Sequence, residues 1–176
     1  MLRLGQELKQ ETVIYGVQEG YRAAALMKQL NAKALIDLRW PEKSRDSDPD
    51  QEEPLRVLEA RDKAPSTAAE LKKAGVLFAF YAGALTQPGD VSKAVKKAID
   101  AGLPSADAVR ALTLSAAEIY GVADRIGSID KGKIANLVVT SGDLFQDRTK
   151  IKFVLVDGVK YEPAAGQPAF QSEATR

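Results

Sequence analysis

The stretch from Ala108 to Tyr161 constrains the fold more than any other part of the chain, because its hydrophobic pattern changes there from helical to β. Ser115-Ala-Ala-Glu118 has the spacing of a capping box, in which both side chains accept backbone N–H groups at the start of a helix. Gly121 follows at a position where a left-handed residue commonly ends a helix. Asp157-Gly158 between two apolar runs is typical of a two-residue β-hairpin. The stretch therefore predicts two helices followed by a strand and a hairpin.

Upstream of this stretch, short β-rich runs alternate with helical segments. Strands are expected at residues 12–17, 34–40 and 76–81, and the continuous apolar run of the third is typical of a strand that is buried on both faces. Such an order indicates βα units around a parallel sheet, so the expected fold class is α/β. The other expected elements are helices at 2–10, 19–30, 54–61, 67–75 (opened by a second capping box, Thr67-Ala-Ala-Glu70), 91–101 (capped by Asp90) and 104–112, a turn at 130–133 and a strand at 136–140.

The composition excludes several classes of function. Among 176 residues the net charge is +1, which argues against a nucleic-acid or polyanion partner because such proteins need a basic excess. The chain has no cysteine, so it has no disulfide and no thiolate metal site. It also has no histidine, the usual acid–base group near neutral pH and the commonest metal ligand. Ser-His-Asp triads and histidine-based zinc sites are therefore excluded within this chain.

No apolar run approaches the ~20 residues that a membrane helix needs. The first ten residues are charged and amphipathic and do not resemble a signal peptide. We therefore expect no membrane partner and a cytoplasmic location for the chain as given, although a longer parent could be exported. Residues 163–176 have no hydrophobic periodicity, and we expect them to be disordered.

One run of the sequence resembles a known family. The pattern A-L-T-x-x-A-A-x-I-x-G-V-x-D-R-I-G-S-I-x-K-G-K-x-A-N-L-V-V from Ala111 to Val139, closed by V-D-G at Val156 to Gly158, is similar to the C-terminal end of the amidohydrolase superfamily, and most to its imidazolonepropionase-like branch. The resemblance covers most of the chain and is most specific after Pro54. It implies that the three expected strands are the last three of a (β/α) barrel at residues 1–121, followed by a small β-rich composite-type domain at 122–162.

The family reaction is the hydrolysis of C–N bonds with one or two divalent metals such as zinc. The resemblance implies ligands from a His-x-His on the first barrel strand, histidines after the fifth and sixth strands and an Asp after the eighth. The first strands lie outside this chain, and Gly16-Val17-Gln18-Glu19 follows the sixth strand without a histidine. Gly83 stands where the family has its Asp. We therefore expect no metal or other cofactor in this chain.

Other side chains at the strand ends are candidates for the active-site mouth, by which we mean the carboxyl ends of the parallel strands. Asp37 and Arg39 share one face of their strand with Leu35, because alternate residues point the same way. A buried Asp–Arg pair is the simpler interpretation, since buried charges are normally paired. Glu19 is a further candidate, although an acid in the first turn of a helix explains it more simply.

Three other features have a simple interpretation and a functional one. The acidic residues between Asp46 and Glu53 are a solvated charge run rather than a calcium loop, because the central Gly and closing Glu are missing. Trp40 and Tyr81 could contact a ligand at the mouth or pack in the core.

Two functional hypotheses follow. The chain is either the C-terminal part of a metal-dependent C–N hydrolase, inactive alone, or a non-catalytic relative that serves as a binding or scaffold module. Partners would be a chain that carries the missing N-terminal half-barrel, or further copies of this chain, because the strand at Val13 to Tyr15 would leave an unpaired edge.

Overall fold

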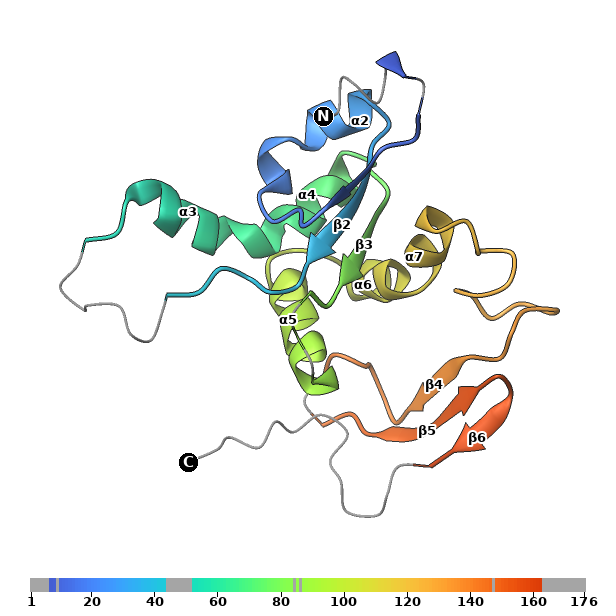
Figure 1. Ribbon diagram of the computed structural model, residues 1–176. Helices are drawn as coiled ribbons and strands as arrows, with labels where there is room; N and C mark the ends of the chain where they lie inside the picture. The colour runs from blue at the N-terminus through green and yellow to red at the C-terminus, as the bar shows by residue number, and fades with distance from the viewer. Residues whose placement is uncertain are drawn as a thin grey trace.

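The structure is a computed structural model that describes residues 7–8, 10–43, 52–83, 85, 87–146 and 148–162. It contains a parallel sheet in the order β1-β2-β3 and an antiparallel sheet in the order β4-β5-β6 (Figure 1). The α/β class predicted from the sequence is therefore confirmed. The strands are β1 (Val13–Tyr15), β2 (Lys33–Asp37), β3 (Phe78–Tyr81), β4 (Leu137–Thr140), β5 (Ile151–Val156) and β6 (Val159–Tyr161).

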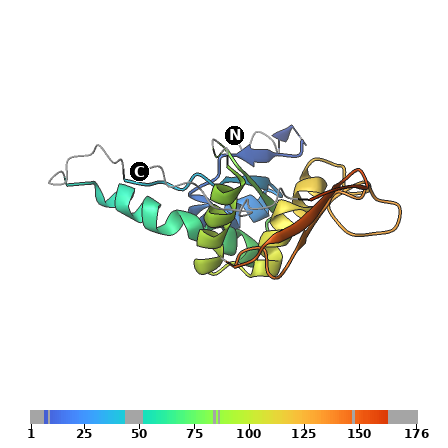
Figure 2. The ribbon, with the colours of Figure 1, turned by 90° about the horizontal axis from the view of Figure 1, so that it is seen from below.

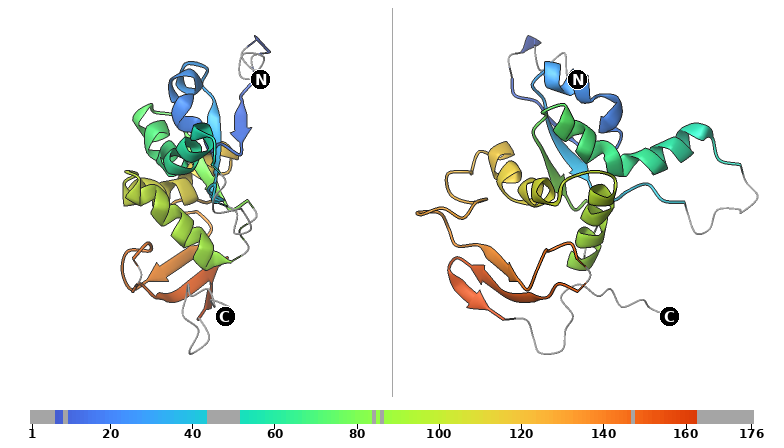
Figure 3. Two further views of the ribbon diagram at one scale, coloured as in Figure 1. Left: turned by 90° about the vertical axis from the view of Figure 1, so that its left-hand side faces the viewer. Right: turned by 180° about the vertical axis from the view of Figure 1, so that it is seen from behind.

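Short helices connect and cover these strands. They are η1 (Gly20–Arg22), α2 (Ala24–Gln29), α3 (Leu55–Lys63), η2 (Ala64–Ser66), α4 (Thr67–Lys73), α5 (Pro88–Asp100), α6 (Ser105–Leu112) and α7 (Leu114–Ile119). In the left view of Figure 3, where the parallel strands run roughly from top to bottom, α2 and α4 lie on one side of the parallel sheet. From below, α3 extends to one side of the molecule and the antiparallel sheet lies on the other (Figure 2). No helix in the described part of the chain is long and apolar enough to cross a membrane.

The two faces of the parallel sheet are built from alternate residues, as strand geometry requires. Even-numbered side chains of β2 and β3 point to the helices and join a large core that includes Met27, Leu71 and Val95. The even-numbered members are Ala34, Ile36, Phe78 and Phe80. Odd-numbered side chains form the inner face, where Leu35 and Ala79 pack against Ile119 of α7. The third predicted strand is thus buried on both faces, as its apolar run indicated.

The hairpin is confirmed in detail. Asp157 and Gly158 have φ values of 51° and 83°, the two positive angles that a type I′ turn requires. The Asn136 side chain accepts the Asp157 N–H at 2.7 Å and orients the turn. Phe145, in the loop between β4 and β5, is buried in the main core and anchors the antiparallel sheet to the rest of the molecule.

Both predicted capping boxes are wrong. Ser115 lies inside α7, which begins at Leu114, and Glu118 instead pairs with Arg110 at 2.7 Å. Thr67 is likewise helical, because a 3₁₀ turn runs directly into α4, and its hydroxyl donates to the Gln18 carbonyl at 2.6 Å. In both cases a side chain that the local pattern assigned to a cap, Glu118 or Thr67, instead bonds to a residue outside its own helix.

Two further helix predictions need correction. Asp90 does not cap its helix, since α5 begins earlier, at Pro88. The expected helix at 19–30 is broken into η1 and α2. Gly20, which opens η1, is packed so closely that a Cβ there would lie 2.7 Å from Val17 and 2.8 Å from Thr67, so this turn has no room for a side chain at position 20. The predicted helix at 2–10 and tail at 163–176 lie largely or wholly outside the described residues.

Candidate functional site at the carboxyl end of the parallel sheet

Asp37 is the polar group at the centre of the candidate site. It ends β2 directly beside Tyr81, which ends β3 in the paired register. The residue is 9% exposed, and its carboxylate accepts the Arg39 backbone N–H at 2.9 Å and the Tyr81 hydroxyl at 3.3 Å. Burial and then the negative charge of Asp37 raise the pKa of Tyr81, so this phenol remains a proton donor to the carboxylate.

Gly83 follows β3 and lies against the same carboxylate. Its φ of +58° is in the left-handed region that favours glycine. A Cβ at this position would lie 2.5 Å from Oδ1 and 3.1 Å from Cγ of Asp37. The space that a side chain at position 83 would need is therefore already filled by the Asp37 carboxylate.

The other two mouth candidates do not join Asp37. The Arg39 side chain is exposed, and the described contacts include no ion pair between it and Asp37. Arg39 reaches Asp37 through its backbone N–H instead. Glu19 pairs with Arg22 at 3.0 Å, and Arg22 also reaches Glu59 at 3.2 Å. Glu19 is thus part of a surface ion-pair group, and of the three candidates only Asp37 faces the end of β3.

Two tyrosines that the sequence did not indicate extend the site across the inner face. The Tyr15 ring meets the Tyr81 ring edge-on, with centroids 5.4 Å apart. The Tyr15 hydroxyl is hydrogen-bonded to that of Tyr120, just after α7, and this bond raises the pKa of Tyr120. Tyr15 and Tyr120 are 60% and 59% exposed, so the inner face presents an open aromatic surface. The alternation of β1 could have placed Tyr15 there, but nothing local marked Tyr120.

The remaining candidates are explained by structure. Trp40 is buried and donates its indole N–H to the Ala94 carbonyl at 2.8 Å, so it packs in the core. Of the acidic run, Glu53 forms two hydrogen bonds with Arg61, at 2.9 and 2.6 Å, while residues 46–50 lie outside the described part.

The residues present do not fit the divalent metal that the family resemblance implies. The sequence has no histidine, and among the described side chains no three metal-binding groups gather in one place. The Asp37 carboxylate also blocks position 83, where the resemblance places a ligand. We therefore derive no chemical step through a metal in this chain.

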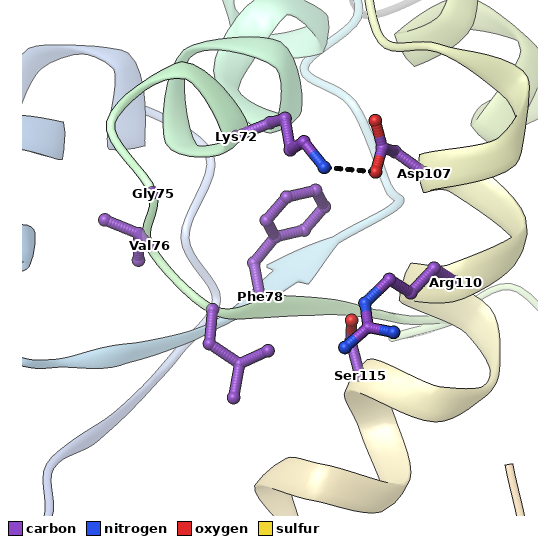
Figure 4. A pocket seen from close by; sticks show the side chains of 8 residues that line it. Lys72, Gly75, Val76, Phe78, Asp107, Arg110 and Ser115 are labelled. Atoms are coloured by element: carbon purple, nitrogen blue, oxygen red, sulfur yellow. Dashed lines mark hydrogen bonds and ion pairs between the residues drawn. The ribbon is translucent and has the colours of Figure 1, made fainter.

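A cavity of about 270 Å³ lies at the opposite, amino end of β3, between α4, α6 and α7. Figure 4 shows Lys72 and Asp107 pointing toward each other across it, beside Phe78. These two side chains form an ion pair, and Arg110 is paired with Glu118. Its cations are thus matched by carboxylates, and the cavity is separate from the strand ends where Asp37 lies.

Comparison with known proteins defines the class. The model of the amidohydrolase family matches residues 56–162, more than half of the sequence. The chain therefore belongs to the amidohydrolase family. Among curated proteins, adenine deaminase 3 of Rhizobium meliloti strain 1021 is 36% identical over 74 residues, which are 42% of this chain and 12% of that protein.

Solved structures show the same fold over nearly the whole chain. An amidohydrolase from Thermotoga maritima MSB8 is 27% identical with a TM-score of 0.71, covering 92% of this chain and 40% of that one. A Xaa-Pro dipeptidase, solved with methionine in its active site, is 21% identical with a TM-score of 0.65, covering 92% and 42%. This chain thus spans about two fifths of the length of these solved relatives and a smaller part of the curated one.

Proposed function

We propose that this chain is the C-terminal part of an amidohydrolase-type (β/α) barrel, with β1, β2 and β3 as its last three strands and β4, β5 and β6 as part of a small composite-type domain. The parent reaction would be the metal-dependent hydrolysis of a C–N bond in a non-peptide or cyclic amide, as in the imidazolonepropionase-like branch. The match to the Thermotoga maritima amidohydrolase supports this, since it covers 92% of this chain but only 40% of that one.

The observation that carries the proposal is that both edge strands of the parallel sheet have unpaired backbone groups. Among the residues that the structure describes, the parallel sheet has three strands, with β1 and β3 at its edges. In a parallel ladder backbone groups alternate in direction. On β2 the Leu35 carbonyl accepts from the Val17 N–H on the β1 side, while the Ala34 N–H donates to the Leu77 carbonyl on the β3 side. On the β3 side the odd-numbered residues therefore turn their backbone groups to β2, and the N–H and C=O groups of Phe78 and Phe80 point away from it. Unpaired edges of this kind invite a further strand, and parallel sheets are normally covered on both faces.

This chain alone is expected to be inactive. It has no histidine and has glycine at position 83, so it can supply neither of the metal ligands that the resemblance assigns to this part of the barrel. A complementary segment with the first five strands would bring the His-x-His, while the ligands after strands six and eight would still be missing. The completed barrel would therefore be a weak or altered metal enzyme.

The second candidate is a non-catalytic binding or scaffold module, which pairs with further copies of itself. The observation that favours it is the blocked position 83, because truncation alone would not change that residue. The open edges and the exposed tyrosines would then be covered by a homo-oligomer.

The test is affinity purification of the tagged chain from its native lysate, with the bound chains identified by mass spectrometry. The first proposal expects a stoichiometric partner, or a longer form of the same chain, that carries His-x-His and five further barrel strands. Recovery of the chain alone, or of its own copies only, overturns it and favours the second candidate. Robust C–N hydrolysis by the assembled parent with added zinc or cobalt would contradict the expected weak activity.

A further inference from the structure

The ends of β2 and β3 hold one carboxylate between them. Asp37 reaches across the sheet from β2, and its Oδ1 lies 2.5 Å from where a Cβ of residue 83 would be. Its Oδ2 is 3.3 Å from the same point, so the whole carboxylate covers that position. Real Cβ atoms essentially never lie within 3.0 Å of another non-bonded heavy atom, so the 2.5 Å approach to Oδ1 means that a side chain at 83 would require Asp37 to move.

Asp37 has little freedom to move away. Its carboxylate is held on one side by the Arg39 backbone N–H and on the other by the Tyr81 hydroxyl. Asp37 as a residue is only 9% exposed, so turning its carboxylate away would leave these two donors without their acceptor in a largely buried place. Unpaired donors in such positions are strongly unfavourable.

We propose that Asp37 has taken over the side-chain space of position 83, so that a carboxylate at one position excludes any side chain at the other. The steric exclusion stands by itself, and only its consequence rests on the proposed function: in a completed barrel the acid group beside the end of β3 comes from Asp37. A Gly83→Asp change therefore does not by itself rebuild the mouth, because it places two carboxylates in the space of one. Asp37 must be shortened first.

A mutant cycle on the isolated chain tests the exclusion. Gly83→Ala adds a Cβ against Asp37 and also strains a left-handed backbone. Gly121→Ala is the matched control, because Gly121 has a φ of +71° and nothing within 4 Å of an added Cβ. We expect Gly83→Ala to lower Tm by at least ~4 °C more than Gly121→Ala.

The same change is then made in an Asp37→Ala background. There the added Cβ has space, and we expect Gly83→Ala to lower Tm only as much as Gly121→Ala does. Asp37→Ala with Gly83→Asp is expected to be more stable than Gly83→Asp alone. Equal losses from Gly83→Ala in both backgrounds, or a loss equal to that of Gly121→Ala beside Asp37, would overturn the proposal.

Two features keep the outcome interpretable. If Gly83→Ala fails to fold beside Asp37, the comparison of Asp37→Ala with the double variant still measures whether the clash is gone. No partner chain is needed, so a failed purification of a barrel partner leaves this result intact. A failed cycle likewise leaves the proposed barrel untouched.

Discussion

The two faces of the parallel sheet differ in how completely they are covered. On the helical side, Ile36 is fully buried and the packed helices leave no large side chain of β2 in contact with solvent. On the inner side, Leu35 is covered by α7, but Val13 and Tyr15 are 38% and 60% exposed. A strand with one buried face normally exposes polar side chains on the other face, whereas β1 exposes an aliphatic and an aromatic side chain to solvent. The helical face of the parallel sheet is therefore covered within this chain, whereas part of its inner face is exposed to solvent.

The largest expected effect on stability comes from a substitution on the covered, helical face. Ile36→Ala should lower the free energy of unfolding by ~2–5 kcal/mol, because it leaves a cavity in a closely packed core. Val13→Ala, on the open face of the neighbouring strand, should change it by less than ~1 kcal/mol in the isolated chain. Urea unfolding of the two variants measures both values. Equal losses would show that the inner face is packed as firmly as the outer one and would remove the contrast.

A buried hydrogen bond sharpens the same contrast. Thr67 is fully buried, and its hydroxyl joins α4 to the segment after β1 through the Gln18 carbonyl. Thr67→Val keeps the shape but leaves that carbonyl without its donor, so we expect a loss of ~1–3 kcal/mol in urea unfolding. Thr113→Val is the matched control, because Thr113 is exposed, directly follows α6, and donates its hydroxyl to the Val109 carbonyl one turn back in that helix. The control should lose less than ~0.5 kcal/mol, and a reversed order would contradict this account.

The smallest effect concerns acid stability on the periphery. Hydrogen bonds from Arg61 hold the pKa of Glu53 below its ordinary value of 4.5. A carboxyl group whose pKa is lower when folded stabilises the protein above its unfolded pKa, and this contribution is lost as pH falls through the folded pKa. Arg61→Gln should therefore reduce stability slightly near pH ~7 and less near pH ~3.

Guanidinium unfolding at both pH values gives the comparison for Arg61→Gln. The control is the same change in a Glu53→Gln background, where the titrating group is gone. There the effect of Arg61→Gln should not vary with pH. A variation that persists without Glu53 would assign the acid sensitivity to another group.

The sequence predicted the elements whose signal is local or periodic. The alternation of apolar runs and helices identified all three parallel strands, and Asp157-Gly158 identified the hairpin because only a few residues tolerate two positive φ values. The capping boxes failed for a physical reason: Thr67 and Glu118 have tertiary partners, Gln18 and Arg110, that a four-residue pattern cannot contain. Tertiary contacts of this kind override local propensity.

The candidate site was predictable in part. Asp37 was identified because it shares one face of an expected strand with Leu35 and Arg39, and Gly83 because of the family resemblance. Their contact was in principle accessible, since the carboxyl ends of adjacent parallel strands meet at one edge of the sheet. The orientation of Arg39 and Glu19 could not be predicted, because whether a long side chain turns to the site or to solvent depends on neighbours that are distant in sequence, such as Glu59, which joins the Glu19–Arg22 pair.

The central claim, that the inner face and the β1 edge are covered in the native assembly, can be measured directly because the chain has no cysteine. Val13→Cys places a single thiol on the open edge, and Lys96→Cys places one on the exposed part of α5. Each variant is labelled with a thiol reagent as the isolated chain and again in its native lysate. We predict that both react freely in isolation and that only Val13→Cys is protected in the lysate. Equal labelling of Val13→Cys in both conditions would contradict the account and leave this chain as a fold with a permanently open face.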